Sequence, residues 1–107
     1  MNYTPDKWSI IKITGTDPHY RVFGSWSGGY LDGDSWRMNS GIVAVEEDGD
    51  YYFFKGHSGS TYQCHKSMYG FNVYGAGVAQ DLCERSGGNM EIVQEQPNIL
   101  EMEWIIS

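Results

Sequence analysis

The sequence predicts a single α+β domain, residues 1–107, in which an antiparallel sheet of five to seven strands carries one helix on one face. Short segments rich in β-branched and aromatic residues alternate with turns that contain glycine, aspartate or proline. Only residues 72–86 have the apolar spacing of a helix. A chain of 107 residues with 40% hydrophobic content can bury a sizeable core without metals or disulfides.

Two strands are predicted at the beginning of the chain. Residues 7–14 (KWSIIKIT) are dominated by isoleucine and tryptophan, and the adjacent Ile10 and Ile11 indicate either a bulge or burial on both faces. Residues 15–18 have the composition of a turn. Residues 19–26 form the second strand, so the two segments are expected to pair as a hairpin.

The strongest strand pattern is a hairpin formed by residues 42–46 and 51–55. Between them, Asp48-Gly49 is a short-range signal for a two-residue turn, because positive φ is needed at both positions of the common turn type. This turn would place Val45 opposite Tyr52. The acidic residues around the turn are expected to form a solvated tip.

The next turn lies near Gly59, and its length sets the register of the following strand. A two-residue loop at Ser58-Gly59 would place Gln63 opposite Phe54 and spoil the apolar face. A three-residue loop with Gly59 left-handed places Tyr62 there instead. We therefore expect the longer loop, which gives a core face of Val43, Val45, Tyr52, Phe54, Tyr62 and Cys64.

The helix and a last strand pair complete the prediction. Asn72 is a suitable cap for the helix of residues 72–86, and Gly87 ends it. The apolar stripe of the helix consists of Val78, Ala79, Leu82 and Cys83. Residues 90–95 and 99–106 are expected to be strands, because apolar and acidic residues alternate in the second of them.

Charge and cysteine content limit the function classes. With 14 acidic and 7 basic residues the formal charge is −7, which opposes direct binding of nucleic acid and suits a protein partner with a basic surface. Two cysteines, and no leader or long apolar run, predict a cytoplasmic protein with reduced thiols and no membrane span.

No residue pattern predicts catalysis, a metal or a cofactor. A zinc site would need four histidine or cysteine ligands close together, and the sequence contains no C-x-x-C pair. Its histidines and cysteines are His19, His57, His65, Cys64 and Cys83. Neighbouring Cys64 and His65 would point to opposite faces of a strand, so buried free thiols are expected instead of zinc. Residues 56–60 do not match the G-x-S-x-G pattern that surrounds the catalytic serine of a nucleophile elbow. We therefore predict a protein that is not an enzyme.

The segment of residues 25–41, SWSGGYLDGDSWRMNSG, is the expected binding loop. Loops longer than about 12 residues are usually functional, and tyrosine, tryptophan and arginine dominate interface hot spots. The alternative is that its aromatic rings close one end of the core, and both interpretations stay open. The expected contact residues, with the acidic tip included, are Trp26, Tyr30, Asp32, Asp34, Trp36, Arg37, Asn39, Glu47, Asp48 and Asp50.

The run VFGSWSGGYLDGDSWRMNSGI, followed by VEEDGDYYFFKGHSGSTYQCHK, resembles short uncharacterised proteins encoded by tailed bacteriophages, over about residues 20–70. Such families carry no assigned activity, but the resemblance implies a context in which small acidic proteins bind and block host machinery. The expected function is that of a phage-encoded inhibitor in the host cytoplasm, which occludes a basic surface of a host or defence protein.

A second function class is also retained. The aromatic loop of residues 25–41 and the tip of residues 57–60 would suit a small-ligand module, because ring faces and polar side chains can hold a nucleotide or a sugar. An open sheet edge would in addition allow a homodimer.

Overall fold

The structure, a computed structural model, describes residues 2–28 and 33–104. The strands of this part of the chain are β1 (Asn2–Tyr3), β2 (Lys7–Ile13), β3 (His19–Trp26), β4 (Ser35–Met38), β5 (Ile42–Asp48), β6 (Tyr51–Gly56), β7 (Thr61–His65) and β8 (Met90–Val93). An α-helix, α2 (Val73–Arg85), and a short 3₁₀ helix, η1 (Ile99–Glu101), complete the described elements.

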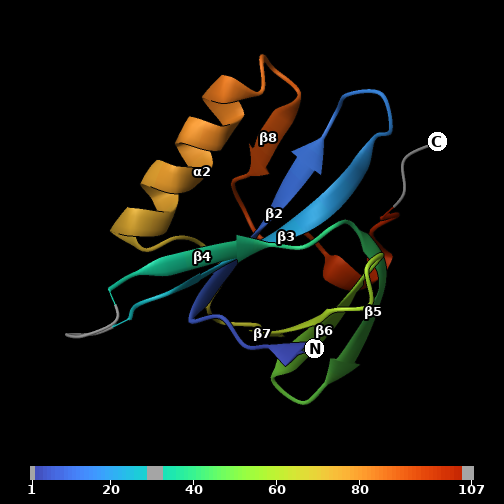
Figure 1. The fold of residues 1–107 in the computed structure, drawn as a ribbon. Helices are drawn as coiled ribbons and strands as arrows, with labels where there is room; N and C mark the ends of the chain where they lie inside the picture. Colours follow the sequence, from blue (N-terminus) through green and yellow to red (C-terminus); the bar gives the residue numbers. More distant parts are fainter. Residues whose placement is uncertain (1, 29–32, 105–107) are drawn as a thin grey trace.

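The fold is mixed α+β and has three layers (Figure 1). The described strands form two four-stranded sheets, with orders β1-β7-β6-β5 and β4-β3-β2-β8, and α2 covers the outer face of the second sheet. The prediction of one antiparallel sheet is therefore wrong in two respects. The strands are divided between two sheets, and β1 pairs with β7 in parallel.

Strand β2 is buried on both faces. Trp8 and Ile10 are 0% exposed and belong to the core between the sheets, whereas Ile11 is 1% exposed and packs toward α2. A strand covered on both sides lacks the usual alternation of apolar and polar residues. Burial on both faces, and not a bulge, therefore explains why Ile10 and Ile11 are adjacent. The predicted hairpin of β2 and β3 is confirmed.

The core between the sheets is built around Trp8. Its ring centroid lies 4.8 Å from that of Tyr69 and 5.3 Å from that of Phe54. The indole Nε1 donates a hydrogen bond of 2.7 Å to the carbonyl of His65, so burial leaves no unpaired donor on the ring. The other buried members of this core are Ile10, Val22, Ile42, Tyr62, Cys64, Ile99 and Trp104.

The helix follows the prediction closely. Asn72 caps α2, because its Oδ1 accepts a hydrogen bond of 2.6 Å from the backbone nitrogen of Gly75. Gly87, at φ 68°, lies just beyond the end. The helix lies close to the sheet at Gly75, where an added Cβ would approach the Ser25 side chain to 3.2 Å. Ala79 is buried on the predicted stripe, with Val78 and Leu82 beside it.

The hairpin of β5 and β6 has a different turn from the predicted one. Val45 lies opposite Phe54, so the two-residue turn consists of Gly49-Asp50 and not of Asp48-Gly49. Gly49 has φ 59°, and no described residue other than glycine has positive φ. A turn with glycine first needs positive φ only at that glycine, so the aspartate avoids strain.

The predicted core face is confirmed except at Val43. A bulge between Ile42 and Ala44 turns Val43 outward and leaves it 47% exposed. The three-residue loop before β7 is confirmed, because Tyr62 lies opposite Phe54 and Gly59 has φ 96°.

The end of the chain departs from the prediction. Strand β8 forms and pairs with β2, but residues 99–104 form η1 and an irregular segment in place of a strand. Ile99 and Trp104 fill the core between the sheets, while Leu100 is 53% exposed. Burial at positions 99 and 104 does not match the alternation of a strand. Residues 105–106 of the predicted strand lie outside the described residues.

Asn39 is where the chain leaves the second sheet for the first. Its backbone nitrogen donates to the carbonyl of Val22 at 3.0 Å, and its side-chain Oδ1 accepts from the nitrogen of Val22 at 2.9 Å. The amide oxygen thus replaces the backbone carbonyl in the ladder, which frees the backbone to turn. Asn39 is 4% exposed, so its predicted role as a contact residue is replaced by a structural one.

Replacing Asn39 should therefore destabilise the fold. Asn39→Ala leaves the backbone nitrogen of Val22 without an acceptor in a buried site, which costs about 1–3 kcal/mol. Urea unfolding monitored by tryptophan fluorescence measures the change. Asn98→Ala is the control, because Asn98 is exposed and its side chain makes no cap hydrogen bond. Equal stability of the two variants would contradict the role given to Asn39.

Tyr69 joins β2 to β8 through its hydroxyl, which accepts from the nitrogen of Ile10 at 3.1 Å and donates to the carbonyl of Val93 at 2.5 Å. Burial raises the pKa of Tyr69 to about 12, although the hydrogen bond from Ile10 opposes the shift. The folded protein therefore keeps a proton that the unfolded chain releases near pH 10.

We expect the free energy of unfolding to fall as the pH rises from about 10 to about 12. Burial also raises the pKa of Tyr62 to about 12, so both side chains contribute to this loss. Absorbance titration of tyrosinate should show that Tyr69→Phe removes one group that ionises near pH 12. An unchanged titration above pH 11 would contradict the assignment.

Candidate functional site

The predicted binding loop is in large part a β-arm that extends from the second sheet (Figure 1, left). Residues 25–26 belong to β3 and residues 35–38 form β4, which the prediction missed, so residues 27–34 make up the connection. Among the described strands, β4 pairs only with β3, so it is an edge strand of its sheet. Four residues are too few for a pattern of alternation, and pairing with β3 is what makes this segment extended.

Trp36 is the exposed aromatic residue of the arm. It is 38% exposed, and its ring stacks on Phe23 with a centroid distance of 5.4 Å and an interplanar angle of 9°. Phe23 is 1% exposed and also contacts Phe71, at 5.6 Å. One face of the indole is thus fixed on the core, and part of the side chain faces solvent. The interpretation that the ring helps to close the core is confirmed for Trp36, and its role in binding stays a prediction.

Arg37 points to the opposite side of β4 from Trp36, because successive side chains of a strand alternate. Its guanidinium carbon lies 4.5 Å from the centroid of the Tyr3 ring, which is a cation–π contact. The ion pairs of the described residues involve Lys55, Lys66 and Arg85, and Arg37 belongs to none of them.

The other predicted contact residues of the arm differ in exposure. Trp26 is half-buried, and its Nε1 donates a hydrogen bond of 2.9 Å to the carbonyl of Thr4. Asp34 is exposed. Tyr30 and Asp32 lie outside the described residues.

A pocket of about 520 Å³ is lined by residues of the arm and by Tyr3 of β1. Its volume is in the range of small-molecule sites. The residues that line it are Tyr3, Trp26, Ser27, Gly28, Gly33, Ser35, Trp36 and Arg37. The structure therefore brings together three of the predicted site residues, Trp26, Trp36 and Arg37.

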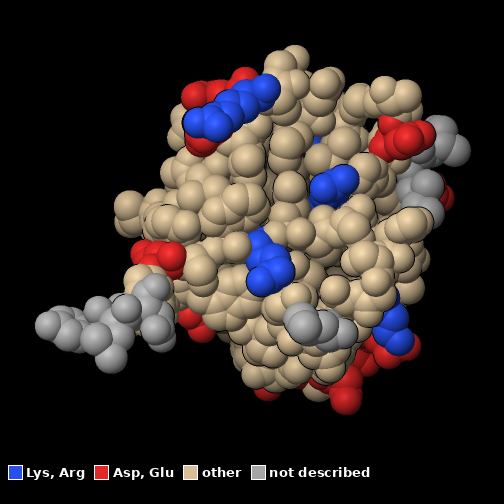
Figure 2. All heavy atoms as spheres, in the orientation of Figure 1, with Lys and Arg blue, Asp and Glu red and all other residues tan. Residues whose placement is uncertain are grey.

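The acidic tip is a separate surface from the arm. In Figure 2 acidic side chains gather at the lower end of the visible face, over the hairpin of β5 and β6. Glu47 lies opposite Tyr52 and not opposite Asp50, because the turn differs from the predicted one. Glu47 pairs with Lys66 at 2.6 Å. Asp48 and Asp50 are exposed and make no ion pair within the described part of the chain.

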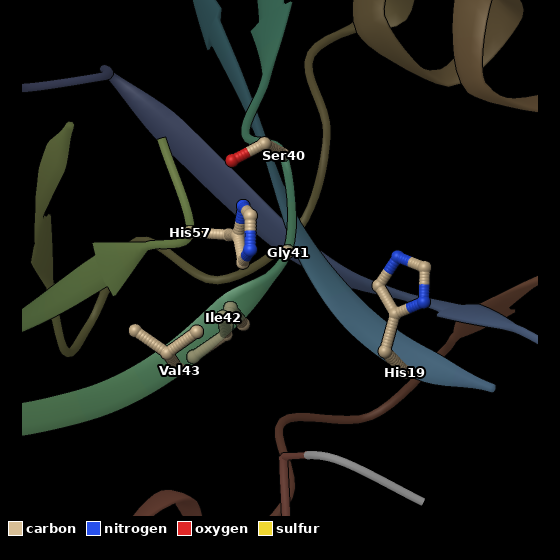
Figure 3. A pocket seen from close by; sticks show the side chains of 6 residues that line it. All are labelled: His19, Ser40, Gly41, Ile42, Val43 and His57. Atoms are coloured by element: carbon tan, nitrogen blue, oxygen red, sulfur yellow. The ribbon is translucent and has the colours of Figure 1, made fainter. Parts of the chain in front are cut away.

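A second pocket, of about 260 Å³, was not predicted (Figure 3). It lies where the chain enters β5, and it is lined by His19, Ser40, Gly41, Ile42, Val43 and His57. The His19 ring is fixed by Arg21, whose Nε donates to His19 Nε2 at 2.9 Å. Three separate segments form this pocket, and no local sequence pattern signals such a meeting.

Neither cysteine is suited to nucleophilic chemistry. Cys64 is 0% exposed, and burial raises the pKa of its thiol well above the ordinary value. Burial, and then the nearby Glu91, also raise the pKa of the Cys83 thiol. Since the thiolate is the reactive form, the raised pKa values lower the reactivity of both thiols at neutral pH. Among the described residues, no group of three or more His, Cys, Asp or Glu side chains could hold a metal ion.

Comparison with known proteins adds no family, because no family model, curated protein or solved structure matches the chain. Within the described residues, no helix has the length and apolar character needed to cross a membrane.

The thiol environments can be tested with an aromatic disulfide reagent at pH 8. We expect Cys83→Ser to leave a protein that does not react in buffer, because Cys64 is buried and protonated. In denaturant the same variant should release one equivalent of product. Fast reaction of Cys64 in the folded variant would contradict the position of Cys64 in the core.

Proposed function

We propose that this protein is a small acidic binding protein without enzymatic activity, which docks on a basic surface of another protein. The observation that carries the proposal is Trp36, a partly exposed indole held flat against the buried Phe23 on an edge strand. An aromatic anchor that is already ordered loses little conformational freedom on binding. Arg37, on the same strand and outside the described ion pairs, adds a second side chain of the hot-spot type.

Charge supports a basic partner. The chain carries a formal charge of −7, and four of the predicted contact residues are exposed carboxylates: Asp34, Glu47, Asp48 and Asp50. Complementary charge speeds the encounter and favours the correct partner over others. The predicted mechanism is occlusion, in which the arm docks and the acidic tip faces the partner's basic groups.

The biological context is part of the proposal. The resemblance of about residues 20–70 to proteins of tailed bacteriophages supports a phage-encoded inhibitor that acts in the host cytoplasm. The partner would be a host or defence protein, and its basic surface would be one that normally holds nucleic acid.

A second candidate function rests on the pocket of about 520 Å³. Tyr3 and Trp26 supply aromatic rings there, and Arg37 supplies a cation, so a nucleotide or a sugar would find suitable groups. Thermal-shift measurements with nucleotides and glycans separate the two functions. A ligand at 100 times its Kd would add about 2.7 kcal/mol to the stability of a small-ligand module.

The test of the main proposal is recovery of a stoichiometric partner from a bacterial host lysate, followed by affinity measurement with the purified partner. Trp36→Ala should weaken binding by about 2 kcal/mol or more, because a central anchor is lost. Higher salt should slow association.

Val73→Ala is the matched control for Trp36→Ala. Val73 is 94% exposed, so truncating it removes apolar surface without touching the arm. Circular dichroism should show that both variants are folded. Equal affinities of wild type, Trp36→Ala and Val73→Ala would contradict a role of the arm in binding.

A further inference from the structure

Strand β5 has an open edge with free backbone groups. The pair that closes the Gly49-Asp50 turn is hydrogen-bonded, and hydrogen-bonded pairs alternate with non-bonded ones along an antiparallel ladder. Ala44, Glu46 and Asp48 therefore direct their N–H and C=O groups to β6. Between them, Val45 and Glu47 direct these groups away from the sheet.

This edge is accessible. Strand β5 is the last strand of its sheet, and it is longer than β4, β8 or β1, which form the other edges. Within the described residues, the backbone groups of Val45 and Glu47 make no hydrogen bond outside the ladder of β5 and β6. The side chains of Val43 and Ala44 are exposed, as are all those from Glu46 to Asp48.

The edge is acidic along half its length. Glu46, Glu47 and Asp48 follow one another in the strand, and only the first two have lysine partners, at 3.1 and 2.6 Å. Exposed ion pairs of this kind contribute little and can exchange partners. A second copy of the chain would bring a formal charge of −7 to this edge, whereas a basic segment would bring the complementary charge.

The other end of the edge meets the pocket of about 260 Å³ (Figure 3). Val43, which is 47% exposed, offers aliphatic surface there, and the imidazoles of His19 and His57 lie on either side of Gly41. Along the strand, Val43 and Asp48 are about 17 Å apart, which is five residues at the rise of a strand. A single extended segment can therefore reach the pocket and the acidic run together.

We propose that the open edge of β5 binds an extended segment of the protein partner as an additional strand. The segment carries an apolar side chain for the pocket and, three to five positions away, lysine or arginine opposite Glu46–Asp48. Main-chain hydrogen bonds to Val45 and Glu47 provide affinity, and the pocket and the carboxylates provide selectivity. The inference rests on the proposed function, because it uses Glu47 and Asp48 of the acidic tip that the proposal assigns to the basic partner, but it does not use the arm.

A fluorescent synthetic peptide tests the inference directly. The first probe is about ten residues long, alternates lysine with threonine, and ends in leucine. The second probe has the same residues in the reverse order, so the two probes test both directions of the added strand. We expect one of the two orders to bind with a Kd below about 1 mM, and the peptide with glutamate in place of lysine not to bind. Amide hydrogen exchange should slow at Val45 and Glu47.

The matched variants are Glu47→Pro and Glu47→Ala. Both remove the carboxylate and its bond with Lys66, but only proline removes the outward N–H that the added strand would use. Since this N–H makes no bond to β6, proline is tolerated at this edge position. Glu47→Pro should bind the peptide at least about tenfold more weakly than Glu47→Ala.

Three outcomes would overturn the inference: neither probe binds at about 1 mM, the two variants bind equally, or protection appears elsewhere than on β5. Dimers of the chain that protect Val45 and Glu47 would assign the edge to a second copy and would also overturn it. If a partner recovered from lysate binds more weakly to Trp36→Ala and yet binds Glu47→Pro and Glu47→Ala with equal affinity, the inference fails and the proposed function stands.

Discussion

The structure depends on one strand that is covered on both sides. Trp8 and Ile10 of β2 hold the sheet of β5, β6 and β7 in place, and Ile11 of the same strand holds α2. Two cores are therefore separated by a single layer, and β2 and β3 belong to both. Between the sheets, the ring of Trp8 contacts the rings of Tyr52, Phe54 and Tyr69. A chain of this size gains a second buried face in this way.

The same arrangement creates the surfaces proposed for binding. Because the chain must pass from the second sheet to the first, β4 ends at Met38, just before Asn39, and β5 begins immediately after Gly41. That passage leaves β4 as an edge with Trp36 exposed on one side of it, and β5 as an edge with the smaller pocket at its start. Both surfaces proposed for binding thus result from the same passage of the chain between the two sheets.

The two surfaces suit different parts of a partner. The arm offers a fixed aromatic ring and a cation, which are suited to a folded surface. The edge of β5 offers backbone groups and carboxylates, which are suited to an extended basic segment. A partner that presents a folded basic domain and a basic tail would engage both, and the gain in affinity would depend on the length of chain between them.

Local chemistry alone determined the helix, the loop before β7 and most of the core face. Asn72 caps the helix through a nearby backbone nitrogen, and Gly59 sets the length of a three-residue loop. The alternation of apolar residues within β6 and within β7 then fixes which side chains face the core. Tertiary structure decided the rest. The division into two sheets, the extended form of β4, the burial of Asn39 and the pocket between His19 and His57 all arise from residues far apart in the chain. Their free energy comes from contacts that no short stretch contains, so no local pattern records them.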